Sequence, residues 1–185
     1  MQAPSGIAIS TSTLVAHAIG GGHAAHARLY AHAAGCVILV FAGLEFLALE
    51  LLRHQLVRVF TSDPSVSASF DRISVCVALF VVFDCFQAVE GGVLRGLGYQ
   101  SFGAKTNGVV FYLLGLPLGF ALTFHAGMGV SGLVIGLVCA VSTQTAVFFW
   151  RLHRIDWEDE TRRAAERIEE EQPDTPMDEP AEAPS

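Results

Sequence analysis

Charge is scarce in most of this chain and is concentrated at its C-terminal end. Charged residues make up 16% of the 185 residues, whereas roughly 25% is usual for soluble domains. Residues 1–155 contain six acidic and eight basic residues, and the remainder contains twelve acidic residues against three arginines. The formal net charge of −7 therefore belongs to the tail. No basic patch with interleaved aromatic residues is present, which excludes a nucleic-acid partner.

Patterns that would hold a metal or build an active site are also missing from the sequence. The four cysteines lie far apart in apolar stretches without Cys-x-x-Cys spacing, which is typical of small buried side chains rather than a disulfide framework or zinc site. No cysteine or carboxylate joins the histidines near the start of the chain (His17, His23, His26 and His32). No nucleophile–base pair is present either. We therefore expect no metal, no cofactor and no enzymatic activity.

Long apolar runs dominate the rest of the sequence, in which apolar residues make up 52% of the chain. Four stretches reach the roughly 17–25 mostly apolar residues that a bilayer-spanning helix needs, and a shorter one precedes them. The spans cover residues 33–52, 73–94, 108–124 and 130–150, and the partial helix covers residues 6–19. The sequence predicts an all-α fold, a polytopic membrane helix bundle over residues 1–155. Residues 1–13 lack the basic segment of a signal peptide, so these helices would themselves drive insertion into the bilayer.

The orientation of the bundle follows from its basic residues. Short connections make neighbouring helices antiparallel, so the loops alternate between the two sides of the membrane. One side collects Arg28, Arg95, Lys105, Arg151 and Arg154, and the other collects Arg53, Arg58 and Arg72. Because cytoplasmic loops carry the excess of Lys and Arg, we place the tail, residues 156–185, in the cytoplasm. Its composition predicts a short charged helix over residues 157–171 and then a disordered end, both solvated.

Three polar residues in the second span break the rules of a membrane helix. Asp84 lies at mid-span, where a charged side chain costs about 2.5–3.5 kcal/mol to insert and usually marks an ion or substrate pathway. Gln87 and Glu90 follow at three-residue intervals and extend a polar strip along the helix. Asp84 is either a carboxylate that exchanges a proton for a cation or a polar link to a neighbouring helix. Glu45 and Glu50 in the first span are weaker candidates, Glu50 being the one close to basic residues.

Proline and glycine indicate where the helices bend and touch. Pro117 cannot donate a hydrogen bond to the carbonyl of Leu113, which predicts a kink in the third span. Gly-x-x-x-Gly spacing occurs in three places and predicts close packing of helices (Gly92–Gly96, Gly115–Gly119 and Gly132–Gly136).

Two stretches resemble the multidrug and toxic compound extrusion (MATE) transporters. They are GGVLRGLGYQSFGAKTNGVVFYLLGLPLGFALTF and GMGVSGLVIGL. In that family a glycine pair and Val-Leu-Arg-Gly close the tenth helix, Asn, Tyr and Gly-Leu-Pro characterise the eleventh, and Met-Gly-Val opens the twelfth. The matching residues are Gly91, Gly92, Arg95, Gly96, Asn107, Tyr112, Gly115, Leu116, Pro117, Gly129 and Gly132. The resemblance covers residues 6–155, from the end of the eighth helix to the twelfth.

The resemblance implies the C-terminal part of a twelve-helix, two-lobed antiporter that exports organic cations or xenobiotics against protons, or in some members sodium. An acidic residue seven positions before the glycine pair is implicated in transport in that family, and Asp84 occupies this place. Gln87, Glu90 and Tyr112 would line the cavity, and Pro117 would supply a flexible point. The family often has Glu where this chain has Asp84. The first seven helices of the family have no counterpart here, and transport would need that missing N-terminal lobe.

Two functions remain open at the level of sequence. The first is a fragment of a transporter in the plasma or vacuolar membrane, with a small cationic substrate. The second is a truncated, non-transporting membrane protein that acts through helix association or oligomerisation. Asp84→Asn would separate them, because asparagine can still form hydrogen bonds between helices but cannot carry a proton. The sequence leaves the substrate, the coupling ion and the membrane undetermined.

Overall fold

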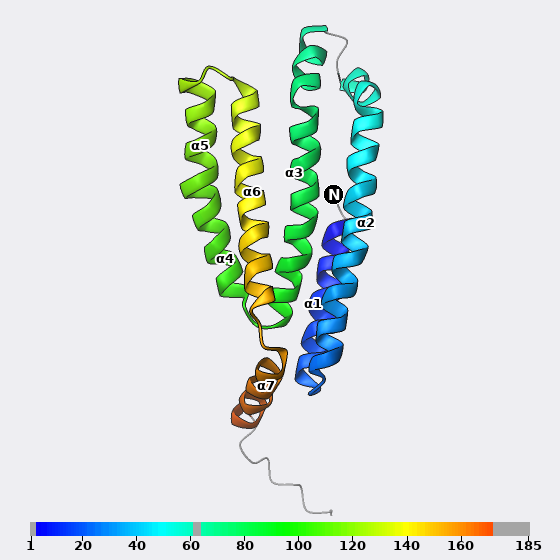
Figure 1. Ribbon diagram of the computed structural model, residues 1–185, viewed down its shortest axis with the longest axis vertical. Helices are drawn as coiled ribbons and strands as arrows, with labels where there is room; N and C mark the ends of the chain where they lie inside the picture. The colour runs from blue at the N-terminus through cyan, green and yellow to red at the C-terminus, as the bar shows by residue number, and fades with distance from the viewer. Residues whose placement is uncertain (1–2, 61–63, 172–185) are drawn as a thin grey trace, which may run out of the picture.

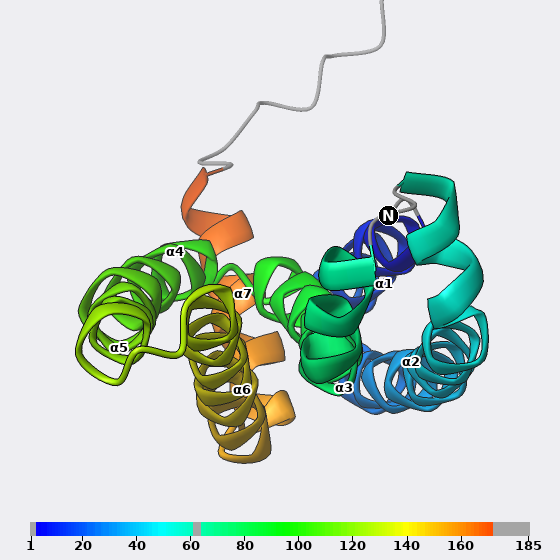
Figure 2. The ribbon, with the colours of Figure 1, turned by 90° about the horizontal axis from the view of Figure 1, so that it is seen from above.

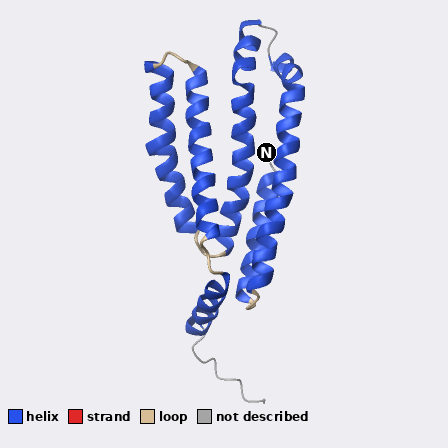
Figure 3. Ribbon diagram, in the orientation of Figure 1, coloured by secondary structure: helices blue, strands red, loops and turns tan. Residues whose placement is uncertain are grey.

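A computed structural model describes residues 3–60 and 64–171, and the predicted disordered end lies outside these residues. Helices and short turns account for the described part, which confirms the all-α prediction (Figure 3). The first half comprises α1 (Ala3–Gly20), α2 (Ala24–Phe60) and α3 (Pro64–Gly96). The second half comprises α4 (Gln100–Val109), η1 (Val110–Gly115), α5 (Leu116–Phe120), η2 (Ala121–His125), α6 (Val130–His153) and α7 (Trp157–Glu171), where η1 and η2 are π-helical segments.

Four helical stretches of the described residues are long and apolar enough to cross a membrane. Their mean hydropathy lies between 1.6 and 2.2. Large apolar side chains remain exposed along them, for example Leu113 at 74% and Leu51 at 70%. Exposure of this kind over whole helices suits a lipid surface rather than water.

The helices extend beyond the spans that hydropathy predicts. Helix α2 has 37 residues, about 56 Å at 1.5 Å per residue, whereas the apolar run inside it covers residues 33–52. Helix α3 likewise begins at Pro64 rather than at residue 73. Hydropathy locates the part of a helix that lies in the hydrocarbon, while backbone hydrogen bonds continue through polar residues to the next turn signal.

Helix α3 is the centre of the bundle (Figure 1). It packs against α1, α2 and α6, while the stretch from α4 to η2 packs mainly on α6. Seen from above in Figure 2, α1, α2 and α3 form one group, and α6 with the α4–η2 stretch forms a second. The polar strip predicted on α3 is therefore carried by the helix with the most helical neighbours.

The three Gly-x-x-x-Gly pairs lie at helix contacts, as predicted. A Cβ at Gly92 would stand 2.5 Å from the carbonyl oxygen of Ala8, and one at Gly136 would stand 2.5 Å from the Cα of Gly119. Such distances are too short for any side chain, so glycine allows α3 to touch α1 and α6 to touch α5 through their backbones.

Glycine also ends α1 and α3 at the same end of the bundle. Gly22 and Gly98 have φ angles of 79° and 83°, which a residue with a side chain rarely adopts. The next amide bonds back to the helix in each case, from Tyr99 N to the carbonyl of Leu94 at 2.8 Å for α3. These are the hydrogen bonds of a glycine helix cap.

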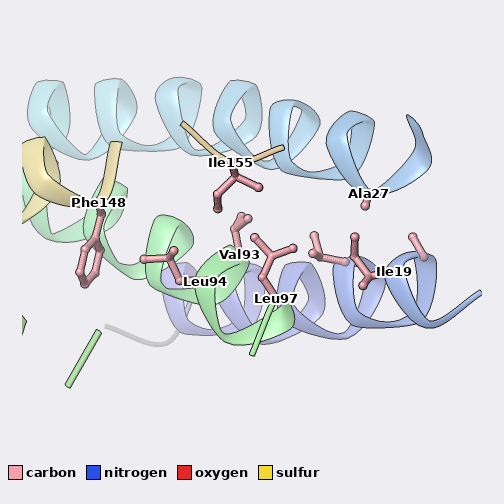
Figure 4. Packing of buried hydrophobic residues seen from close by; sticks show 9 residues of the cluster. Ile19, Ala27, Val93, Leu94, Leu97, Phe148 and Ile155 are labelled. Carbon is pink, nitrogen blue, oxygen red and sulfur yellow. The ribbon is translucent and has the colours of Figure 1, made fainter. Parts of the chain in front are cut away.

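A buried apolar cluster joins the helices at this end. Figure 4 shows it between α1, α2, α3, α6 and the turn before α7. Its members are Val15, Ala18, Ile19, Ala27, Val93, Leu94, Leu97, Phe148 and Ile155. The cluster fixes the lower end of α3, just below the polar strip.

Candidate functional site

The polar strip on α3 lies among helices. Asp84, Gln87 and Glu90 are all half-buried. Their helix contacts α2 through a cluster that includes Cys85. It contacts α6 through Thr145, whose hydroxyl donates to the carbonyl of Phe83 at 3.2 Å. The polar strip therefore lies on a helix that packs against other helices of the bundle. Functional charged residues of membrane proteins usually face the interior of such a bundle.

A second carboxylate from α2 lies near Asp84. The Cys85 thiol donates to Glu45 Oε2 at 3.1 Å, and the carboxylates of Asp84 and Glu45 interact electrostatically. Sequence spacing marked Glu45 only as a weaker candidate, because the pairing depends on how α2 and α3 face each other. The two carboxylates thus come from facing helices and lie in the same part of the bundle.

Glu50, the other acidic residue of the first span, lies outside this arrangement. Its Oε2 atom is 3.5 Å from the guanidinium of Arg53, three residues along the same helix. This ion pair agrees with the position of Glu50 close to basic residues in the sequence. An i, i+3 pair of this kind contributes little to stability and neutralises the charge locally.

Helices α3 and α6, which pack against each other, each carry a glutamine with a buried side-chain oxygen. Gly91 of α3 packs against Phe148 of α6, with a Cβ position 3.6 Å from the Phe148 ring. Gln87 and Gln144 each lie four residues earlier, one helical turn up, on the same faces. Gln144 is 2% exposed. Sequence reasoning missed it, because a neutral residue in the polar stretch STQT gives no signal beyond helix packing.

Several polar oxygens near the strip are buried without a hydrogen-bond partner among the described protein atoms. They include Oε1 of Gln87, Oε2 of Glu90 and Oε1 of Gln144. Unsatisfied oxygens of this kind are rare in proteins and call for an explanation. Three of them on facing helices provide acceptors for a proton, a cation or water.

Glu90 also lines a cavity of about 610 Å³ between α2, α3, α6 and the start of α7. We call it the Glu90 cavity. Its polar lining consists of Arg28, His32, Glu90 and His153, and Phe86, Phe149 and Trp157 are among the apolar and aromatic residues around them. Its volume falls within the range of small-molecule sites.

The structure does not bring Tyr112 to the strip. Tyr112 is 71% exposed and belongs to η1, in the stretch that packs mainly on α6. Its assignment as a cavity residue depends on the resemblance alone and stays a prediction.

Pro117 lies in the most irregular backbone of the membrane body. The π-helical segment η1 ends at Gly115, two residues before Pro117, and η2 begins at Ala121. A proline without an amide hydrogen and a π-helical turn beside it are both recognised causes of bent helices.

No group of three or more histidine, cysteine, aspartate or glutamate side chains that could hold a metal occurs in the part of the chain that the structure describes.

Comparison with known proteins gives a consistent result. The family model described as MatE matches residues 1–121. Multidrug and toxin extrusion protein 2 of Homo sapiens is 34% identical over 157 residues, covering 83% of this chain and 26% of the human protein. Multidrug and toxin extrusion protein 1 of Xenopus tropicalis is 32% identical over 170 residues, covering 90% of this chain and 30% of the frog protein.

Among solved structures, the crystal structure of the eukaryotic MATE transporter AtDTX14 superposes with a TM-score of 0.76 at 28% identity. The match covers 89% of this chain and 37% of that chain. The chain therefore spans about a quarter of the length of the human relative. The names of these proteins describe transporters rather than enzymes, in agreement with the expectation from sequence.

Proposed function

The chain belongs to the MatE family of transporters, and from this premise we propose that it forms the C-terminal part of a proton-coupled exporter of organic cations or xenobiotics. Protons are the proposed coupling ion, with sodium as the alternative that the family resemblance allows. Because the chain spans only part of its relatives, transport requires the remaining helices as well. No bound cofactor is needed for such an exchange.

The observation that carries the proposal is the placement of acidic groups on α3. Asp84 lies at mid-span with Glu45 within electrostatic range. Glu90 lies lower on the same helix, at the wall of a cavity. Carboxylates inside an apolar span favour cations over anions as ligands, because an anion would add unfavourable repulsion to its desolvation.

Exchange follows if a proton and the organic cation compete for the same carboxylate. When Asp84 is protonated it loses the charge that binds the cation, so the cation leaves. When the proton is released on the other side, Asp84 is ionised and binds the next cation. Binding of each ligand lowers the affinity for the other by the same factor, as linkage requires. Movement of the two lobes against each other would expose the site to one side at a time.

Gln87 and Gln144 suit a supporting role in this exchange. Their side-chain oxygens are buried and without partners among the described residues, and Gln87 lies between Asp84 and Glu90 along α3. Neutral acceptors placed in this way can hold water or a cation without competing for the proton.

The test uses the complete transporter that contains this chain. The transcript is read upstream of Met1, and the full-length protein is reconstituted in proteoliposomes. Uptake of tetraethylammonium is then measured under an imposed proton gradient. We expect Asp84→Asn to abolish gradient-driven uptake, because asparagine cannot bind a proton. Glu50→Gln serves as the matched control in the neighbouring span and should retain uptake.

Two results would contradict the proposal. Full uptake by Asp84→Asn would exclude this carboxylate from coupling. A transcript that starts at Met1, with a chain that inserts and oligomerises alone, would favour the non-transporting membrane protein instead.

A further inference from the structure

Helix α7 is docked on the bundle. The charged sequence of residues 157–171 predicts a solvated helix, yet Glu160 is only 7% exposed. Helix α7 contacts α1 and α2, and Figure 1 shows it beneath the bundle, at the end where α1 and α3 terminate. One face of α7 therefore packs against the rest of the protein, although the charged composition of the helix gives no sign of it.

A polar contact attaches α7 to the turn between α3 and α4. The Tyr99 hydroxyl donates a hydrogen bond to Glu160 Oε1. The guanidinium of Arg151, at the end of α6, lies 4.5 Å from the centre of the Tyr99 ring. Arg163 lies 3.7 Å from Glu160. We call these four residues the latch, because they join α6, α7 and the α3–α4 turn in one contact.

The segment that leads into α7 forms part of the wall of the Glu90 cavity. Ile155 and Trp157 both line this cavity together with Glu90. Ile155 is 8% exposed and belongs to the buried cluster of Figure 4. Displacing α7 would therefore remove part of the cavity wall at the end of the bundle where α1 and α3 terminate.

The helix depends on its docked position. Asp156 caps it, with Oδ1 accepting the amide of Glu158 at 3.0 Å. It has 15 residues, a length at which an isolated helix is marginal in water. Ala164 also packs against the buried apolar cluster, whereas ion pairs such as Arg162 with Glu166 at 3.9 Å lie on the helix's own surface. The latch and the apolar residues Ile155, Trp157 and Ala164 therefore hold α7 in its docked position.

We propose that α7 is a cytoplasmic lid on the Glu90 cavity, fastened by the Tyr99–Glu160 contact, and that its release opens the cavity to the cytoplasm. The role of the lid in controlling the access of protons or substrate rests on the proposed function. The docking of α7 and its effect on access to the Glu90 cavity do not depend on transport.

Access to the cavity from the cytoplasmic side can be measured through Cys36, which lines the cavity and is exposed in the absence of a bilayer. The other three cysteines are replaced (Cys76→Ser, Cys85→Ser and Cys139→Ser), and the chain is placed in membranes open to the cytoplasmic side. A charged, membrane-impermeant maleimide is then added from that side. The flank of the cavity at Leu39 and Phe149 faces the bilayer, where the charged reagent does not enter.

We expect Tyr99→Phe to raise the labelling rate of Cys36 about fivefold, since one hydrogen bond to a charged group is lost. Deletion of residues 157–171 should raise the rate further. Arg162→Gln is the matched control on α7, because its ion pairs lie within the helix, and it should leave the rate unchanged.

A second measurement confirms that the lid moves. With Trp150→Phe, Trp157 is the only tryptophan of the chain, and its emission should shift to longer wavelength in Tyr99→Phe as it becomes hydrated. Equal labelling rates in the parent, Tyr99→Phe and the deletion would overturn the lid. So would an increase in Arg162→Gln equal to that in Tyr99→Phe. Because no substrate or gradient is used, these results stand whether or not Asp84 couples transport.

Discussion

Helices α1 to α6 pack through backbones and apolar side chains, whereas α7 is attached to them largely through polar side chains. In the membrane body, glycines such as Gly92 and Gly136 bring helices into direct contact, and the buried oxygens of Gln87, Glu90 and Gln144 lack partners. In α7, the buried Glu160 is hydrogen-bonded and ion-paired. These three oxygens in the body therefore cost stability and are available for ligands, while Glu160 of α7 helps to hold that helix in place.

The largest effect is expected where the body packs most tightly. Gly136→Ala should destabilise the protein by about 3 kcal/mol, because the new methyl group would stand 2.5 Å from Gly119 Cα. Gly43→Ala is the matched control, with nothing within 4 Å of the added Cβ, and should be neutral or slightly stabilising. Thermal unfolding in one detergent compares them. Equal stability of the two variants would show that backbone contact does not hold the body.

Replacement of Gln144, the unpartnered glutamine at the α3–α6 contact, should change stability in the opposite direction. Gln144→Leu should stabilise the chain by about 1–2 kcal/mol, because a buried oxygen without a partner is replaced by an apolar group of similar size. Transport by the full-length protein should fall at the same time if the oxygen serves a ligand. Gln55→Leu, on an exposed residue, is the control. A destabilised Gln144→Leu protein would mean that the Gln144 oxygen has a hydrogen-bond partner. Polar groups would then stabilise the membrane body as they stabilise the docking of α7.

Part of the fold and of the candidate site could be predicted from sequence alone. The spans and Asp84 follow from hydropathy, because a carboxylate in an apolar run stands out without any knowledge of its neighbours. Gln144 does not stand out, since its importance comes from its burial at the contact between α3 and α6. Glu45 needed the pairing of α2 with α3 for the same reason.

The docking of α7 could not be predicted from sequence, for a different reason. Its composition is that of a solvated helix, although Trp157 and Ala164 pack against the buried cluster and Glu160 bonds to Tyr99. Tyr99 stands 61 positions away from Glu160, and no local period connects them.

Docking of α7 should weaken at alkaline pH. Burial raises the pKa of Tyr99 above its ordinary value of 10.0, the hydrogen bond and charge of Glu160 raise it further, and Arg151 offsets part of the rise. A raised pKa in the docked state means that stability is complete below pH 10.0 and is lost as pH rises through the docked-state pKa. Trp157 emission in Trp150→Phe should follow this loss, and Tyr99→Phe should abolish the pH dependence. An unchanged alkaline transition in Tyr99→Phe would assign it to another group.

The smallest effect is expected from the exposed ion pairs of α7. Arg162 is paired with Asp159 and Glu166 on its own helix, and its side chain is 71% exposed. Arg162→Gln should therefore change stability by less than about 0.5 kcal/mol, because water and salt screen such pairs. Arg163→Gln should cost more, since Arg163 also pairs with the buried Glu160, and the loss leaves that carboxylate with fewer partners. Urea titration of the Trp157 signal in the Trp150→Phe background measures both. If Arg162→Gln released α7 as readily as Arg163→Gln, docking would depend on the net charge of the helix, and the latch would not be the contact that holds it.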